Sequence, residues 1–214
     1  MIDRRGFGFA LLASAAVVGA PAQAQTPTLS FLTAGPGSGF LSYGQGIAIV
    51  VNASGLVGLD VIETAGSIEN LKRVEADPTC IGAAFIGSAY AAIHGVGPFA
   101  GKQHGALRAI APMYETSYQA VAKAGRGINK AADLSGKRVG IGAAGEAAEA
   151  LFLGLAELTG IAPIIVNGSS AELETALLAD AIDAIWQGAS LPVPSLARVA
   201  EKCDSVVFGL TDEE

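Results

Sequence analysis

The chain has 214 residues, of which 51% are hydrophobic and only 15% are charged, so it is long enough to bury the core of one or two domains. Its formal net charge is −7, from 13 Lys and Arg against 20 Asp and Glu. This acidic balance argues against binding to nucleic acid or to an anionic membrane surface, because both require clusters of basic residues.

The first 24 residues have the pattern of a signal peptide. The pair Arg4-Arg5 precedes an apolar segment over residues 7–18, and the small-residue sequence Ala22-Gln23-Ala24 follows. We expect cleavage near Ala24, since the apolar segment is shorter than the roughly 20 residues that span a bilayer; an uncleaved anchor is the alternative. Paired arginines also occur in twin-arginine export signals. The sequence therefore predicts an exported, periplasmic protein that has no stable membrane insertion after cleavage.

Residues 29–50 are typical of a strand, a glycine-rich turn and a helix. An apolar run at 29–32 leads into the turn, and apolar residues recur at helical spacing from Phe40 onward. Glycines allow positive φ and let backbone amides approach a bound group. The first amides of a helix have no partner inside it, and the helix dipole favours an anion there. The turn is thus predicted to bind a ligand, with packing alone as the alternative.

This turn does not match a known cofactor fingerprint. A dinucleotide-binding pattern needs glycine where Phe40 stands, and no Gly-Lys-Ser/Thr sequence follows as in a phosphate-binding loop. We predict no cofactor.

The alternation of strands and helices continues along the chain. Strands are expected at 59–62, 80–86, 118–123, 139–142, 164–166 and 181–186, and helices after residue 67 and at 147–158, 170–178 and 195–202. Ser67 and either Ser169 or Ser170 are the expected N-caps. This order predicts parallel sheets with ligands beyond the strand ends, where two helix N-termini face each other across a cleft and suit a carboxylate or a zwitterion.

Several sequence blocks resemble the solute-binding subunits of TRAP transporters of the TAXI family. They stand in that family's order and spacing from Ser30 to about Leu210, and they are Thr33-x-Gly35-x-Gly37, Thr64-Ala65-Gly66-Ser67-Ile68-Glu69-Asn70-Leu71, Gly95-Val96-Gly97-Pro98-Phe99, Leu107-Arg108-Ala109-Ile110-Ala111, Tyr114-Glu115, Asp133-Leu134-Ser135-Gly136-Lys137-Arg138-Val139, Gly142-Ala143-x-Gly145 and Ile182-Asp183-Ala184.

The resemblance implies a two-lobed α/β fold like that of type II periplasmic binding proteins. Each lobe is expected to be a mostly parallel sheet with flanking helices, with lobe I at 25–116, lobe II at 117–210 and a tail at 211–214. Members of the family continue beyond the point where this chain stops, so the resemblance also implies an incomplete first lobe.

The resemblance further implies a receptor that captures a small organic acid or amino acid between its lobes and passes it to the membrane permease subunits of a TRAP transporter. Ligand contacts carried over onto this sequence are Gly35, Gly37, Ser38, Phe40, Ser67, Glu69, Asn70, Ala144, Gly145 and Glu146. We add Gly39, Ser88 and Tyr114, which lie near the same turns, to the predicted contacts. Gly142 and Ala143 belong to the last of these turns. Ser88 is included because Phe85-Ile86-Gly87 replaces the family's Gln-Ser-Asp and leaves Ser88 as the nearest hydroxyl.

Glu146 departs from the family, which tends to have serine there, and two roles are open for it. Pointing into the cleft, it would repel a carboxylate and attract an ammonium group. Alternatively it complements the dipole of its own helix, a contribution of about 0.3–1 kcal/mol. An amino acid, with its ammonium group at Glu146 and its carboxylate at the opposite loop, is the preferred ligand.

Trp186 is the only tryptophan, and it ends a predicted strand just before Gln187 and Gly188. Its ring is expected either to stack on a ligand or to pack in the core. We include Trp186 and Gly188 among the predicted ligand contacts.

The remaining chemistry-bearing residues predict neither a metal site nor an enzyme. Cys80 and Cys203 are expected to be free thiols, and His94 and His104 to lie in a solvated loop without the neighbours of a metal site. Ser38 lacks the glycine pattern of a nucleophile elbow. The alternatives to a TRAP receptor are the receptor of an ATP-driven importer, a secreted serine hydrolase using Ser38, and a truncated product that binds nothing.

Overall fold

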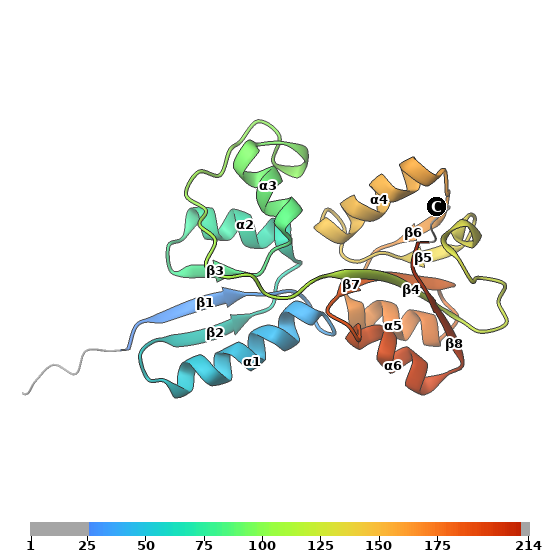
Figure 1. Ribbon diagram of the computed structural model, residues 1–214, viewed down its shortest axis with the longest axis horizontal. Helices are drawn as coiled ribbons and strands as arrows, with labels where there is room; N and C mark the ends of the chain where they lie inside the picture. Colours follow the sequence, from blue (N-terminus) through green and yellow to red (C-terminus); the bar gives the residue numbers. More distant parts are fainter. Residues whose placement is uncertain (1–25, 211–214) are drawn as a thin grey trace, which may run out of the picture.

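The computed structural model describes residues 26–210, so the predicted signal peptide and the tail 211–214 lie outside the described residues. Two groups of elements form, each around its own sheet (Figure 1). We call the elements from β1 to η1 the first lobe and those from β4 to β8 the second lobe. Within the described part of the chain, no helix combines the length and the apolar character needed to cross a membrane.

The first lobe is built on a parallel sheet of order β2-β1-β3, with bounds Thr28–Leu32 (β1), Gly58–Ile62 (β2) and Cys80–Gly82 (β3). Figure 1 shows α1 on one side of these strands and α2 and α3 on the other. The helices are Gly39–Ala53 (α1), Ser67–Ala76 (α2) and Ile86–His94 (α3), followed by a short 3-10 helix, Gly97–Phe99 (η1). Phe31, Phe40 and Leu59 form the core beneath α1.

The second lobe has a five-stranded sheet of order β6-β5-β7-β4-β8. Its strands are Ser117–Lys123 (β4), Arg138–Gly140 (β5), Ile164–Val166 (β6), Ala184–Ala189 (β7) and Ser205–Phe208 (β8). Strands β5, β6 and β7 are parallel, whereas β4 is antiparallel to both of its neighbours. One side of the sheet carries α4, Ala147–Thr159, and the other carries α5, Ser170–Leu178, and α6, Pro194–Lys202 (Figure 1). A short 3-10 helix, Ala131–Leu134 (η2), precedes β5.

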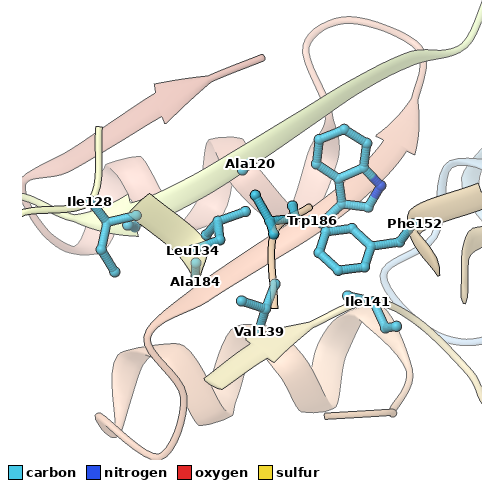
Figure 2. Packing of buried hydrophobic residues seen from close by; sticks show 10 residues of the cluster. Ala120, Ile128, Leu134, Val139, Ile141, Phe152, Ala184 and Trp186 are labelled. Carbon is cyan, nitrogen blue, oxygen red and sulfur yellow. The ribbon is translucent and has the colours of Figure 1, made fainter. Parts of the chain in front are cut away.

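The second lobe has the more completely buried core. Phe152 of α4 packs on Val139, Ile141 and Trp186 over the sheet, as Figure 2 shows. On the opposite face, Val121 and Ile185 pack against α5 and α6 in a second cluster.

An extended segment connects the lobes and leads into β4 (Figure 1). Met113 and Tyr114 of this segment pack against the first-lobe core, and β4 begins three residues after Tyr114. The strand predicted at 118–123 is confirmed as β4, which pairs only with strands of the second-lobe sheet.

The predicted α/β class is confirmed, and most predicted elements lie within a few residues of the observed ones. Two strands are misplaced. The predicted strand 80–86 ends at Gly82, and Ile86 already begins α3. The predicted strand 181–186 begins only at Ala184, because the amides of Ala181 and Ile182 donate to the carbonyl of Ala176 and close the turn after α5.

Two further expectations are wrong. Ser67 is not an N-cap: Gly66 occupies that position with φ 141°, and Ser67 Oγ accepts a hydrogen bond of 3.1 Å from the amide of Phe85. His104 does not lie in solvent, since only 3% of it is exposed and its ring packs edge-on against Phe99. Cys80 and Cys203 are both free thiols.

Candidate ligand-binding site

A cavity of about 150 Å³ lies between the two lobes. The starts of four helices line it: residues 38–40 at α1, Gly66 and Ser67 at α2, residues 146–148 at α4, and Ser169 and Ser170 at α5. The end of β7 adds Trp186, Gln187 and Gly188. Helix starts meet here because each of these helices follows a strand that ends at the edge of its sheet facing the other lobe.

The start of α1 is open to the cavity. Ser38 is its N-cap and accepts a hydrogen bond of 3.1 Å from the amide of Leu41. The amides of Gly39 and Phe40 have no hydrogen-bond acceptor within the described residues. The first turn of α1 carries no acidic residue, so its dipole is not complemented locally. These two amides form a site for an anionic ligand atom.

The start of α2 is filled by a side chain of the other lobe. Glu146 reaches across, so that its Oε2 accepts from the amide of Ile68 at 2.8 Å and its Oε1 from the amide of Glu69 at 3.1 Å. Only 7% of Glu146 is exposed. Burial raises the pKa of its carboxyl, although both amide hydrogen bonds oppose that change. The side chain of Glu146 thus makes no capping hydrogen bond to its own helix and caps α2 of the other lobe instead. Its pairing with a solute ammonium group stays a prediction.

Gly66 makes the approach of Glu146 possible. A Cβ on Gly66 would lie 3.1 Å from Glu146 Oε2, and its φ of 141° is a conformation that side chains disfavour. A second contact joins the lobes nearby, where the amide of Ala171 donates to the carbonyl of Pro36 at 3.1 Å. The lobes are therefore in direct contact on two sides of the cavity.

Acidic residues of the second lobe itself serve the starts of α4 and α5. Ser169 and Glu172 form a capping box at α5, and the amide and hydroxyl of Ser169 lower the pKa of Glu172. Before α4, Glu149 Oε2 accepts from the amide of Gly145 at 2.5 Å and its Oε1 from Nδ2 of Asn167 at 2.9 Å. The amides of Ala147 and Ala148, at the start of α4 itself, have no acceptor within the described residues. The prediction of Ser169 as a cap is confirmed.

Aromatic rings form the apolar part of the cavity wall. Phe40 lies 5.1 Å from Phe85 and 6.3 Å from Tyr114 between ring centroids. Burial raises the pKa of the Tyr114 phenol to about 12, so this hydroxyl stays protonated at neutral pH.

Trp186 belongs to the core but keeps one unsatisfied polar atom. Tyr118 stacks on the indole at 5.6 Å and Phe152 packs against it, so its ring is part of the second-lobe core. Only 5% of Trp186 is exposed, and its Nε1 has no hydrogen-bond partner within the described residues. Figure 2 shows this nitrogen on the edge of the ring that faces away from Ile128 and Leu134. A buried donor without a partner at a cavity suits a ligand acceptor.

The structure places many of the predicted contact residues on the cavity wall: Gly35, Ser38, Gly39, Phe40, Ser67, Tyr114, Glu146, Trp186 and Gly188. It places the others outside the wall: Gly37, Glu69, Asn70, Ser88, Ala144 and Gly145. The amide group of Asn70 donates to the carbonyls of Leu32, Thr33 and Ala83, which makes it a structural residue. Gly37 packs against the second lobe, where a Cβ would lie 3.1 Å from the amide of Ala171.

Sequence reasoning missed several wall residues, chiefly Thr64, Ser169, Ser170 and Gln187. The Ser169-to-Glu172 capping pattern was a usable signal, because it marked a helix start at the same sheet edge as the other turns. Gln187 gave no such signal: its amide group donates to Ser170 Oγ at 2.5 Å and accepts from Ser195 Oγ, contacts that are set by the tertiary fold.

Ser38 has no catalytic partner here. No histidine is among the described residues that line the cavity, and the Ser38 hydroxyl oxygen already accepts from Leu41. The arrangement suits binding of a small solute by backbone amides and aromatic groups.

Comparisons with known proteins agree with this geometry. The model of the NMT1-like family matches residues 31–214. An ancestral arginine-binding protein bound to glutamine is 18% identical, with a TM-score of 0.58 over 86% of this chain and 79% of that chain. The substrate-binding protein of an ABC uptake transporter from Streptococcus pneumoniae with bound histidine is also 18% identical, with a TM-score of 0.57 over 86% of this chain and 74% of that chain.

A third structure shows how the chain lengths compare. The periplasmic aliphatic sulphonate-binding protein SsuA from Escherichia coli is 13% identical with a TM-score of 0.49, and the match covers 84% of this chain but only 56% of SsuA. No curated protein sequence matches this chain. The structural likeness confirms the two-lobed fold of type II periplasmic binding proteins that the sequence predicted.

Proposed function

This chain belongs to the NMT1-like family, and from that premise we propose that it is an exported solute receptor that closes two lobes on a small solute and delivers it to a membrane permease. The observation that carries the proposal is the cavity between the lobes, lined by four helix starts. Residues 25–116 and 117–210 are the two lobes that move against each other. Export rests on the signal-peptide pattern of residues 1–24.

A small amino acid fits the cavity best. An apolar cavity of about 150 Å³ accepts benzene, so the solute has the size of alanine or serine. Its carboxylate binds the free amides of Gly39 and Phe40, and the N–H of Trp186 is a further donor. Its ammonium group lies toward Glu146, the one charged residue among the described residues of the cavity wall.

The structural neighbours are consistent with this class of solute. Glutamine is bound in the ancestral arginine-binding protein and histidine in the Streptococcus pneumoniae protein. These proteins share the fold at low sequence identity, so the choice of an amino acid here rests on the cavity.

For the permease, the resemblance of the Gly66-Ser67-Ile68-Glu69-Asn70 block to the TAXI family supports a TRAP transporter. An ATP-driven importer is the second candidate, because the Streptococcus pneumoniae neighbour is a substrate-binding protein of an ABC uptake transporter. The two differ in energy source. Uptake in cells that stops when the ion gradient is collapsed at constant ATP supports the TRAP assignment, and uptake that persists favours the ATP-driven importer.

A thermal-shift screen of the purified protein with amino acids, monocarboxylates and dicarboxylates tests the receptor itself. A ligand at 100 times its dissociation constant stabilises the folded state by about 2.7 kcal/mol, which is a clear rise in melting temperature. We expect small amino acids to give the largest rise. A screen in which no amino acid or carboxylate raises the melting temperature contradicts the proposal.

A further inference from the structure

Glu146 makes the same contacts that a solute carboxylate would make at a helix start. Each of its oxygens accepts from one amide of the first turn of α2, at 2.8 and 3.1 Å, although Glu146 belongs to the second lobe. Two successive amides with no partner inside their helix are the usual place for a bound carboxylate. Here the protein supplies that carboxylate from its own chain.

We propose that Glu146 is a built-in substitute for a solute carboxylate at the start of α2, and that it restricts the receptor to solutes with one carboxylate, excluding dicarboxylates. This inference rests on the proposed function, and it adds the solute class. The first turns of α1 and α4 keep free amides for the single carboxylate that the solute brings.

The charge of Glu146 has no ion-pair partner among the described residues, unlike that of the other buried glutamate. Glu174 is buried to a similar degree, but Arg198 and Lys202 contact its two oxygens at 2.6 and 2.7 Å. No ion pair is found for Glu146 among the described residues; the charges that act on its pKa are those of Glu69, which raises it, and Lys72, which lowers it. The negative charge of Glu146 is thus held mainly by backbone amides, and it repels a second solute carboxylate at this wall.

The rest of the cavity offers hydrogen-bond donors but no positive charge. The amides of Gly39 and Phe40 at α1, those of Ala147 and Ala148 at α4, and the buried Nε1 of Trp186 have no acceptor within the described residues. No Lys or Arg is among the described residues of the wall that could neutralise another carboxylate. A second solute carboxylate would therefore lie near Glu146 without a cation to compensate it, and we expect a dicarboxylate to bind only where Glu146 is absent.

Chemical rescue tests whether α2 holds a carboxylate site. Glu146→Ala removes the carboxylate and leaves the amides of Ile68 and Glu69 without an acceptor. We expect its melting temperature to fall and to recover in a saturable way with sodium acetate, beyond the effect of sodium chloride at equal ionic strength. The matched control is Glu149→Ala, since Glu149 also lies at the start of α4 but bonds only to Gly145 and Asn167 of its own lobe among the described residues.

The outcomes of the rescue are decisive. Recovery in Glu146→Ala that is absent from the wild type and from Glu149→Ala supports the carboxylate site. Acetate that acts no better than chloride on Glu146→Ala overturns it. If Glu146→Ala does not fold even in acetate, Glu146→Ser, which also lacks the carboxylate, takes its place in the same comparison, and acetate that acts on it no better than chloride likewise overturns the proposal.

Calorimetric titration with succinate and L-alanine tests the solute class. We expect succinate to bind Glu146→Ala at least about tenfold more tightly than the wild type, because its second carboxylate takes the place of Glu146. Equal affinity of both proteins for succinate overturns the exclusion of dicarboxylates. The rescue experiment needs no natural solute. If acetate rescues Glu146→Ala but the wild type binds none of the solutes tested, the proposed function is contradicted, whereas the carboxylate site of α2 is supported.

Discussion

The two helix starts that the first lobe presents to the cavity, those of α1 and α2, follow similar glycine turns but have different occupants. At α1 the amides of Gly39 and Phe40 are free, whereas at α2 the amides of Ile68 and Glu69 bind the carboxylate of Glu146. A free helix start is therefore not a property of the turn alone. It depends on which side chain the opposite lobe brings, and this decides where a solute can bind.

The largest expected effect comes from closing the free start of α1. A Cβ at position 39 would lie 2.9 Å from Tyr114 Oη and 3.1 Å from Ala189 Cβ, so Gly39→Ala keeps the lobes apart at this point. We expect its solute affinity to fall at least about tenfold, a loss of about 1.4 kcal/mol, in a calorimetric titration.

The matched control for Gly39→Ala is Gly46→Ala on the same helix, where no atom lies within 4 Å of the added Cβ. Gly46→Ala should bind solute as the wild type does and be more stable by about 0.5–1 kcal/mol. Equal loss of binding in both variants would contradict a role for the start of α1.

The filled start of α2 predicts a loss of stability instead. Glu146→Ala leaves two amides without a partner, and we expect its free energy of unfolding in urea to fall by about 1–3 kcal/mol. Glu149→Ala, which loses two exposed hydrogen bonds within the second lobe, from the Gly145 amide and from Asn167, should lose less than about 1 kcal/mol. If both variants lose the same free energy of unfolding, the contact of Glu146 with α2 does not stabilise the protein more than hydrogen bonds within one lobe do.

A smaller effect is expected from the cap of α1. Ser38→Ala removes the acceptor of the Leu41 amide, and we expect a loss of about 1 kcal/mol of folding free energy. Solute binding should persist, since the amides of Gly39 and Phe40 remain free. Ester or amide hydrolysis by the wild type that disappears in Ser38→Ala would instead identify a hydrolase.

The smallest expected effect is a pH dependence of the free energy of unfolding that the wild type shows and the Glu146→Gln variant lacks. Burial raises the pKa of Glu146 above its ordinary value of 4.5, with Glu69 raising it further and Lys72 lowering it. The folded state then binds the proton of Glu146 more tightly than the unfolded state does. The contribution of this proton to the free energy of unfolding is therefore complete below pH 4.5 and is lost as the pH rises through the raised pKa.

The measurement compares the wild type with Glu146→Gln, which does not titrate. Urea unfolding between pH 4 and pH 8 should show that the stability of the wild type relative to Glu146→Gln decreases as the pH rises. A relative stability that increases over this range means that the folded state lowers the pKa of Glu146.

Local patterns predicted the parts of the fold that local forces determine. The apolar runs gave β1, β4 and β6, and the Ser169 cap with Glu172 three residues later gave the start of α5. The glycine turns that follow the strands predicted the sheet edge at which the helix starts meet. Each of these features depends on residues close together in the chain.

The missed features depend on contacts between distant residues. Glu146 and Ile68 are far apart in sequence, and no pattern around either residue shows that they meet. The capping role of Ser67 was wrong because its hydroxyl instead accepts from Phe85. The ring of Trp186 was expected to stack on a ligand or to pack in the core. It packs in the core, and its unpartnered N–H was not predicted.

The central claim is that the cavity binds a small zwitterion, with its carboxylate at the start of α1 and its ammonium group near Glu146. Calorimetric titration of the purified protein with L-alanine, L-serine and L-threonine, and with propionate as the analogue that lacks an ammonium group, tests it most directly. The account predicts that at least one of these amino acids binds, and at least about tenfold more tightly than propionate. Binding of propionate as tight as that of the amino acids, or no binding by any of them, would contradict it.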